Sequence, residues 1–277
     1  MKIVQSEIPF NYKTIKITKS RIDKGLLAIP ISIIDYFPKE KGEIYVFFGA
    51  RNRALTRSFT PYKSTSRECR IGGMKRFFER NNVNDGDELV IQFLDENTYG
   101  IFTEDQFKQN IRVLENAFDK SESENAASHK ITSISQTTNL SPENVILSEY
   151  YRLSQKELPK RKCAQACAAK RRESVAPPIR KLLKEIYGGK CQVTGFGFLM
   201  KNSKPYFEAH HIKPHIGDHF KNLLVVCPNV HVQFTHARVE ETFDQKGWLR
   251  KVKFNETKYS IFHIVDKISQ FKKEVHS

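Results

Sequence analysis

From Thr14 to Phe102 the chain is built of short apolar runs, most of them alternating with polar residues and separated by turn residues. Seven runs have this character: TIKIT, LLAIPIS, EIYVFF, ALTRSFT, ECRI, ELVIQFL and TYGIF. Such patterns are typical of β-strands. SIIDYF after Pro30 and GMKRFFERNN at 73–82 predict two short helices between them. Seven strands with two helices indicate a small barrel or sandwich.

The rest of the chain has a different pattern. Residues 104–117 predict a helix, and the following SESENAASHKITSISQTTNLSPEN is Ser-rich and almost free of large apolar residues, which favours a linker. PIRKLLKEIYGG predicts a helix that begins at proline and ends at glycine. We therefore expect an α+β protein of two domains, residues 1–104 and 150–277, joined by a helix and polar linker over 105–149.

Charge is distributed unevenly over these parts. The whole chain carries a net charge of +15, of which +14 falls on residues 150–277, +4 on 1–104 and −3 on 105–149. A field of this sign attracts polyanions, either nucleic acid or an anionic membrane surface. No window approaches the roughly 18 apolar residues of a membrane span, and the N-terminus lacks the apolar core of a signal peptide. We expect a cytoplasmic protein with a nucleic-acid partner and no membrane partner.

The five cysteines agree with an intracellular location, because their odd number and scattered positions do not form a disulfide framework. Cys191 is followed three residues later by Thr194 and Cys227 by Val230, so neither begins a CxxC pair, and two thiolates do not complete a tetrahedral zinc site. Structural zinc is therefore not expected, and both thiols are predicted to be buried. Cys163 and Cys167 have helical spacing, which favours simple packing.

Six of the nine histidines lie within residues 210–236: His210, His211, His215, His219, His231 and His236. A single histidine of this kind is usually an ordinary loop residue, but the clustering favours a site. His210 and His211 end an apolar run that breaks at Pro214, a second strand begins at Asn222, and the following CPN starts a helix that carries His231 in its first turn. Two strands and a helix then bring three imidazoles and an amide together.

This stretch, EAHHIKP followed by NLLVVCPNVH, resembles the HNH family of ββα-metal nucleases over roughly residues 188–245, and most closely its branch with a CxVTG opening and an EAxHIxP motif. The resemblance implies that His210 and His231 bind one divalent metal ion, with magnesium or manganese expected. It further implies that His211 is the general base and that Asn222 is the family's asparagine. We expect its amide to close the intervening loop and fix the orientation of His211.

The chemistry suits these residue types. Phosphodiester hydrolysis needs a deprotonated water, and a near-neutral imidazole such as His211 is matched to removing that proton. A divalent cation stabilises the charge that develops on the phosphate and the leaving oxygen. His236 lies five residues beyond His231 rather than four, so it is a weaker ligand candidate, and His215 and His219 are expected in a loop near the phosphate backbone.

The first hundred residues carry a second resemblance. The pattern T-K-S-x-I-x-x-G-x-x-x-IP and the later GGMKRFFERNNVNDGDELVIQF resemble the B-three-type DNA-binding pseudobarrel of plant transcription factors and of the effector domain of EcoRII-type restriction enzymes, over roughly residues 12–104. The resemblance implies two arms that grip the major groove. Their expected DNA-binding residues are Lys19, Ser20, Arg21, Asp23, Arg51, Asn52, Arg53, Arg57, Tyr62, Lys63, Ser66 and Arg67.

Arginine suits this task because its guanidinium can make two hydrogen bonds to guanine, while scattered charges are otherwise an ordinary solvated face. A DNA reader joined to a metal nuclease has the composition of a sequence-specific restriction endonuclease acting on double-stranded DNA. Because one HNH centre cuts one strand, a homodimer is expected during cleavage. Two alternatives stay open: an endonuclease whose barrel reads a methylated base, and a non-catalytic DNA-binding regulator with a decayed HNH fold.

Overall fold

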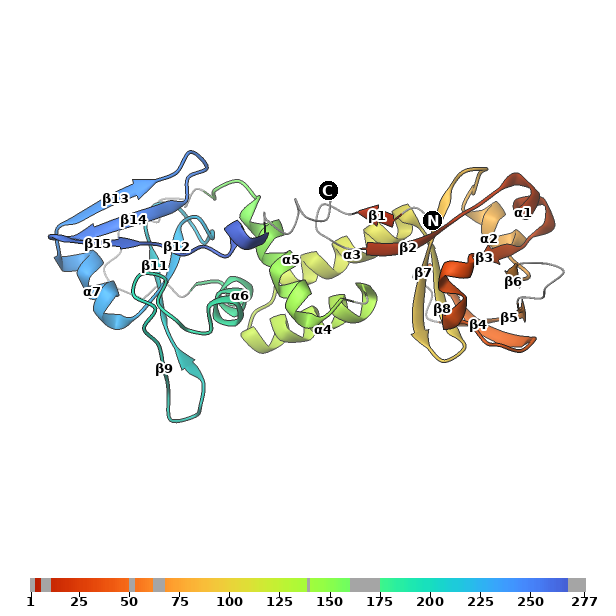
Figure 1. Ribbon diagram of the computed structural model, residues 1–277, viewed down its shortest axis with the longest axis horizontal. Helices are drawn as coiled ribbons and strands as arrows, with labels where there is room; N and C mark the ends of the chain where they lie inside the picture. Colours follow the sequence, from red (N-terminus) through yellow and green to blue (C-terminus); the bar gives the residue numbers. More distant parts are fainter. Residues whose placement is uncertain are drawn as a thin grey trace. The chain divides into compact units, whose positions relative to one another are not determined.

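The computed structural model describes residues 3–5, 11–49, 53–61, 68–138, 140–159 and 175–268. The chain divides into two compact units, which we call unit 1 (residues 1–114 and 134–140) and unit 2 (residues 115–133 and 141–277). Each unit contains both helices and strands (Figure 1). The α+β class expected from the sequence is confirmed.

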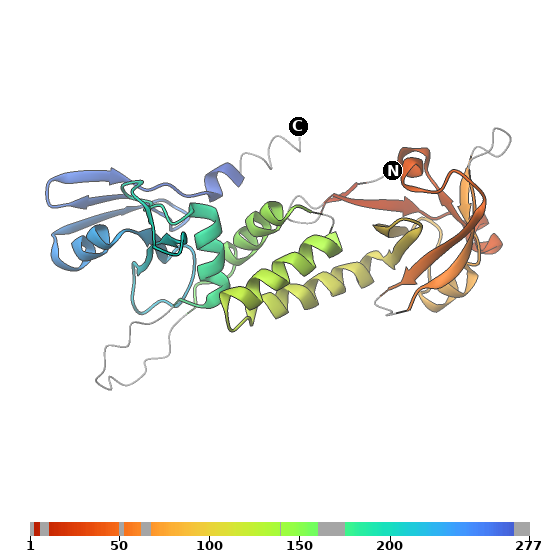
Figure 2. The same cartoon turned by 90° about the horizontal axis from the view of Figure 1, so that it is seen from below.

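Unit 1 is built around one sheet of eight strands in the order β1-β2-β7-β8-β4-β5-β6-β3. Neighbours are antiparallel, except that β4 and β8 run parallel. Without the short β1, seven strands form a nearly closed sheet around the core (Figures 1 and 2), which confirms the predicted pseudobarrel. The strands are β1 (Ile3–Gln5), β2 (Asn11–Lys16), β3 (Leu27–Ile29), β4 (Gly42–Phe48), β5 (Leu55–Thr60), β6 (Cys69–Ile71), β7 (Glu88–Asp95) and β8 (Thr98–Thr103).

Three short helices connect these strands. The 3-10 helix η1 (Ile31–Tyr36) and the helix α2 (Lys75–Arg80) lie where the sequence predicts helices. The helix α1 (Lys19–Lys24) was not predicted, because it buries no residue and therefore has no apolar stripe to mark it. It ends at Gly25, whose φ of 60° is a left-handed conformation that glycine adopts without strain.

The expected polar linker is wrong, because the described residues between 104 and 154 form three helices, with short turns between them. These are α3 (Glu104–Asp119), α4 (Glu124–Thr138) and α5 (Pro142–Ser154). In α4 the side chains of Ala127, Ile131 and Ile134 recur every three or four residues, and all three are buried. The Ser-rich composition concealed this stripe, since serine hydroxyls in the helix bond back to carbonyls of the preceding turn, as Ser128 does to Glu124.

In unit 2 the helix α6 (Pro177–Tyr187) is as predicted and ends at Gly188 with a φ of 57°. Its strands form small antiparallel sheets whose core includes Leu224, Val226, Leu249 and Val252. The elements that follow α6 are β9 (Phe198–Leu199), β10 (Pro205–Tyr206), β11 (Glu208–His211), β12 (Leu223–Val226), α7 (Pro228–His236), β13 (Val239–Phe243), β14 (Leu249–Phe254) and β15 (Thr257–Ser260).

The cysteines of unit 2 follow the prediction where they are described. Cys191 and Cys227 are free thiols buried in this core. Cys163 and Cys167 lie outside the described residues. Among the helices of the described ranges, none combines the length and the apolar character that a membrane crossing requires.

A network of ion pairs joins the end of α3 to α5. Arg152 donates to Asp119 at 2.6 Å and to Glu149 at 2.5 Å, and Lys156 donates to Asp119 at 2.7 Å. The Glu149 side chain is completely buried, and burial raises its pKa to about 7 despite the guanidinium beside it. Its Oε1 atom is buried without a hydrogen-bond partner, so the ionised form is costly in the folded protein.

We expect Glu149→Gln to flatten the pH dependence of the stability of unit 2. The carboxyl group of Glu149 binds its proton more tightly in the folded protein than in the unfolded chain. Its contribution to the free energy of unfolding is therefore fully present below pH 4.5 and is lost as the pH rises to about 7. The difference between these two pKa values corresponds to at most about 3 kcal/mol. Urea unfolding at pH 5 and pH 8, followed by the fluorescence of the single tryptophan, Trp248, measures it. Equal pH dependence in both proteins would contradict the prediction.

Candidate functional site

The candidate site lies where β11, β12 and α7 meet. The strands β11 and β12 pair antiparallel, with His210 opposite Leu224 and His211 opposite Leu223. The helix α7 begins directly after β12, at Pro228, and lies against β11. His231, in the first turn of α7, therefore lies beside β11, the strand that carries His210 and His211.

His210 faces α7. Its ring centroid lies 5.3 Å from that of His231, and its ring stacks on Phe234 with the centroids 4.0 Å apart. Burial, together with the smaller effects of the neighbouring His231 and His211, lowers the pKa of His210 to about 4. The His210 imidazole is therefore neutral at physiological pH, and one of its nitrogens offers a lone pair.

Glu208 holds the second imidazole of this face. Its Oε2 atom lies 2.5 Å from Nδ1 of His231, and Tyr206 donates its hydroxyl to Oε1 at 2.7 Å. Since an ionised carboxylate only accepts, Nδ1 of His231 carries the proton and Nε2 carries the lone pair. Carboxylates commonly orient metal-binding histidines in this way. Glu208 is not among the residues predicted from the sequence, although its position two residues before His210 puts both side chains on one face of the strand.

His211, the next residue along β11, interacts instead with the loop between the strands. Its Nε2 atom lies 2.8 Å from Oδ1 of Asp218, whose Oδ2 accepts a hydrogen bond from the backbone NH of Ala176 at 2.7 Å. The carboxylate places the proton on Nε2 and leaves Nδ1 as the basic nitrogen of His211. The structure thus gives the two adjacent histidines different partners.

Asp218→Asn should test this arrangement. The amide still occupies the position beside His211 but cannot stabilise the imidazolium that forms when His211 takes up a proton. We expect phosphodiester cleavage to slow by about 10- to 100-fold, while binding to duplex DNA stays close to that of the wild type. Single-turnover cleavage rates and a gel shift on one preparation measure both quantities. Cleavage at the wild-type rate would contradict a role of Asp218 through His211.

Asn222 closes the loop that follows β11. Its Oδ1 atom accepts from the backbone NH of Lys213 at 2.8 Å. Its Nδ2 group donates to the carbonyls of Lys213, Ile216 and Gly217 at 3.0 to 3.2 Å. Asn222 is buried, so the amide acts on the loop backbone that leads to Asp218 and through it on His211.

The remaining histidines of the cluster have other places. His219 is buried rather than near a phosphate backbone: its Nδ1 accepts from the backbone NH of Lys221, and its Nε2 lies 3.1 Å from the carbonyl oxygen of Lys156. Burial lowers the pKa of His219, which fits a neutral structural role. His215 and His236 are exposed, His236 as the last residue of α7.

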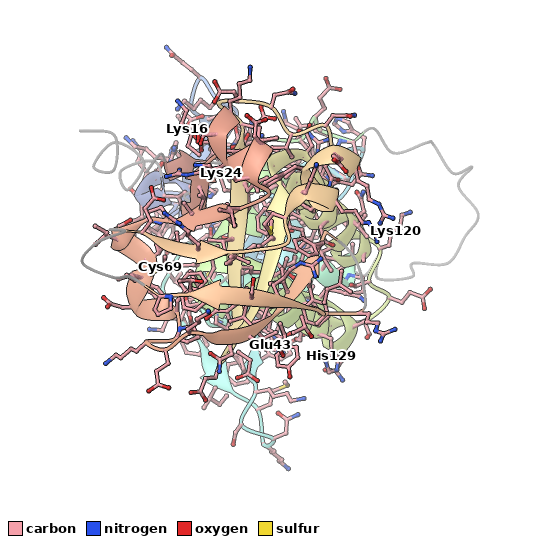
Figure 3. The ribbon with its side chains drawn as sticks, turned by 90° about the vertical axis from the view of Figure 1, so that its right-hand side faces the viewer. Lys16, Lys24, Glu43, Cys69, Lys120 and His129 are labelled. Carbon is pink, nitrogen blue, oxygen red and sulfur yellow. The ribbon has the colours of Figure 1, made fainter. Side chains whose placement is uncertain are left out.

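The predicted arms of unit 1 are described in part. Lys19, Ser20, Arg21 and Asp23 lie on α1, where Arg21 forms an ion pair with Glu68 at 2.7 Å. In the end view of Figure 3, the labelled Lys16 and Lys24 lie on one side of the barrel and Glu43 on the opposite side. Arg53 is exposed and Arg57 is half-buried. The other predicted residues lie outside the described residues: Arg51, Asn52, Tyr62, Lys63, Ser66 and Arg67.

Within the described ranges, no group of three or more His, Cys, Asp or Glu side chains is arranged to hold a metal ion. The residues here supply two imidazoles with available lone pairs, His210 and His231, beside the Glu208 carboxylate. This donor set suits a cation that also takes water or phosphate oxygens as ligands. The two histidines therefore fit a divalent metal as a partial set.

No family pattern matches the sequence, and no curated protein matches it. Two solved structures are similar in part. The Arabidopsis FUS3-DNA complex is 18% identical with a TM-score of 0.28 and covers 33% of this chain and 94% of its own. The modification-dependent restriction endonuclease TagI is 26% identical with a TM-score of 0.25, and covers 34% of this chain and 36% of its own.

Proposed function

We propose that the protein is a metal-dependent HNH-type endonuclease that cuts double-stranded DNA, and that unit 1 directs it to a specific sequence as in a restriction enzyme. One observation carries the proposal. Consecutive residues of β11 have different partners: His210 lies against His231 of α7, whereas His211 pairs with Asp218. This arrangement supports a proposal in which His210 and His231 serve a cation and the adjacent His211 serves as the general base, the two functions that phosphodiester hydrolysis requires.

In this proposal Nδ1 of His211 takes the proton from the attacking water, and Asp218 stabilises the resulting imidazolium. Asn222 and its loop keep Asp218 in position. His210 and His231 would hold a divalent cation, magnesium or manganese, with Glu208 orienting His231. When bound, that cation supplies positive charge against the phosphate and the leaving 3′-oxygen.

The distribution of charge supports the division of labour. Residues 150–277 carry a net charge of +14, which favours contacts to phosphates without regard to sequence. Sequence readout is assigned to the barrel of unit 1, through the arms that contain Arg21 and Arg53. Because each centre cuts one strand, we propose that two copies of the chain act together during cleavage.

Digestion of DNA tests the proposal. Methylated and unmethylated DNA of known sequence is incubated with the purified chain and magnesium or manganese, and the ends are sequenced. We expect 5′-phosphate and 3′-hydroxyl ends at one short sequence, lost when the cation is chelated. Cleavage of methylated DNA alone would show a modification-dependent enzyme instead. Specific binding without cleavage under any divalent cation would favour a regulator.

A further inference from the structure

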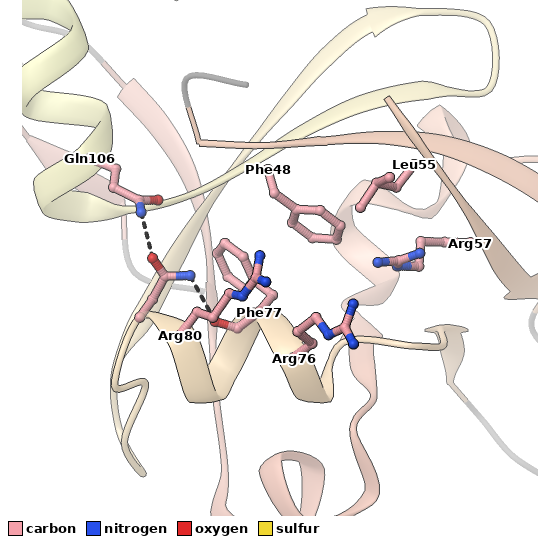
Figure 4. Close-up of a pocket in the computed structure, with 8 residues that line it drawn as sticks. Phe48, Leu55, Arg57, Arg76, Phe77, Arg80 and Gln106 are labelled. Carbon is pink, nitrogen blue, oxygen red and sulfur yellow. Dashed lines mark hydrogen bonds between the residues drawn. The ribbon is translucent and has the colours of Figure 1, made fainter. Parts of the chain in front are cut away.

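Unit 1 contains a pocket of about 110 Å³ between β4, β5, α2 and the start of α3. Three of the residues that line it are arginines, Arg57, Arg76 and Arg80, and no carboxylate is among the described residues of its lining. Figure 4 shows the three arginines around the rings of Phe48 and Phe77. Such a pocket presents positive charge over an apolar floor.

Arg57 is the most enclosed of the three arginines. Its guanidinium carbon lies 5.1 Å from the centroid of the Phe48 ring, and Nη1 donates to the carbonyl of Thr56 at 2.7 Å. The Nε atom is buried without a hydrogen-bond partner. Burial lowers the pKa of Arg57, and the positive charge of Arg76 lowers it further. An acceptor with negative charge would satisfy the guanidinium and relieve this repulsion.

The other walls of the pocket show what kind of anion fits. The Phe48 and Phe77 rings stack with centroids 4.8 Å apart. Gln106 donates to Asn81 at 2.6 Å and accepts from the backbone NH of Thr103, while Asn81 donates to the carbonyl of Phe77 at 2.7 Å (Figure 4). The amide groups are thus engaged with each other and with the backbone, which leaves few groups to read the edge of a base. The arginines dominate, and a guanidinium matches the paired oxygens of a phosphate.

We infer that this pocket binds a phosphate group. The assignment of this phosphate to the backbone of double-stranded DNA rests on the proposed function. A free phosphate ion would bind to the same arginines. The pocket then adds Arg76 and Arg80 of α2 to the DNA-binding surface. It also assigns Arg57 to a phosphate rather than to a guanine, so that Arg57 contributes to affinity and not to sequence choice.

The double variant Arg76→Ala/Arg80→Ala of the full chain tests the site, since both side chains are exposed and their loss should not disturb folding. We expect cognate and random duplexes to bind about 10-fold more weakly, because one charge-assisted contact to a phosphate is lost. The slope of the logarithm of the affinity against the logarithm of the salt concentration should be smaller by about one. The control Lys39→Ala/Lys75→Ala removes two exposed cations of unit 1 outside the pocket. It should change duplex affinity much less.

Inorganic phosphate separates the two sources. Phosphate should raise the thermal unfolding temperature of the wild-type chain, compared with sodium chloride of equal ionic strength, and should do so less for Arg76→Ala/Arg80→Ala. This result together with weaker duplex binding assigns the site to the DNA backbone. The same response to phosphate with unchanged duplex binding assigns the site to a free phosphate. That phosphate site would remain established even if the wild type bound no DNA and the proposed function failed.

Two results would overturn the inference. One is an equal response of the wild type and the double variant to phosphate, combined with equal duplex affinities. The other is evidence that a base enters the pocket: 2-aminopurine fluorescence that rises when the wild type binds a labelled duplex and does not rise with Arg76→Ala/Arg80→Ala.

Discussion

Replacing His211 by Ala is expected to slow DNA cleavage by about 10²- to 10⁴-fold, the usual contribution of a general base. The change removes the nitrogen that takes the proton from water, while His210 and His231 remain in place for the cation. Binding to the recognition sequence should stay within about two-fold, because unit 1 is proposed to read it. A cleavage assay and a gel shift on one preparation measure both quantities.

His215→Ala is the matched control. It also removes one imidazole from the segment after β11, but its side chain is exposed in the loop. We expect this variant to cleave at close to the wild-type rate. If His211→Ala cleaves as fast as His215→Ala, His211 is not the base and the assignment of roles in EAHHIKP has to move to another residue.

The elements with a strong local pattern could be predicted from the sequence. The seven strands of the barrel have alternating or continuous apolar runs that match the sides of the sheet, as in β4, where Ile44 and Val46 are buried and Tyr45 between them is exposed. The helix α6 carries proline at its start and glycine at its end. In both cases the signal lies within a few consecutive residues.

Other features depend on contacts that a local pattern does not contain. The helix α4 relies on three apolar side chains within a Ser-rich stretch, so its composition indicated a linker. Asp218 lies in a loop, seven residues from His211, and becomes its partner only because the loop folds back. Glu208 could have been found, because it shares a strand face with His210. Arg76 and Arg80 could not be predicted as binding residues either. In the sequence, exposed arginines on a short helix cannot be distinguished from ordinary solvent-facing charges, and only the folded structure places them at a pocket.

Asn222→Ala is expected to lower the stability of unit 2 strongly and to slow cleavage as well. The change leaves the backbone NH of Lys213 and three loop carbonyls without the amide that now binds them. Each buried backbone group left unsatisfied costs about 1–3 kcal/mol, although part of the loop will regain hydrogen bonds to water. We therefore expect unit 2 to lose about 2–4 kcal/mol, measured by urea unfolding with Trp248 fluorescence.

Cleavage should fall with stability for a specific reason: the loop that Asn222 closes carries Asp218 to His211, so the base loses its orientation although no residue that contacts the phosphate has changed. Asn222→Asp separates this role from simple packing, since it keeps the volume and the acceptor for Lys213 but turns a negative charge toward the three carbonyls. It should destabilise unit 2 at least as much as alanine at pH 8 and less at pH 5, where the carboxyl can be protonated and donate. If both variants keep wild-type stability and cleavage at pH 8, the amide does not hold this loop.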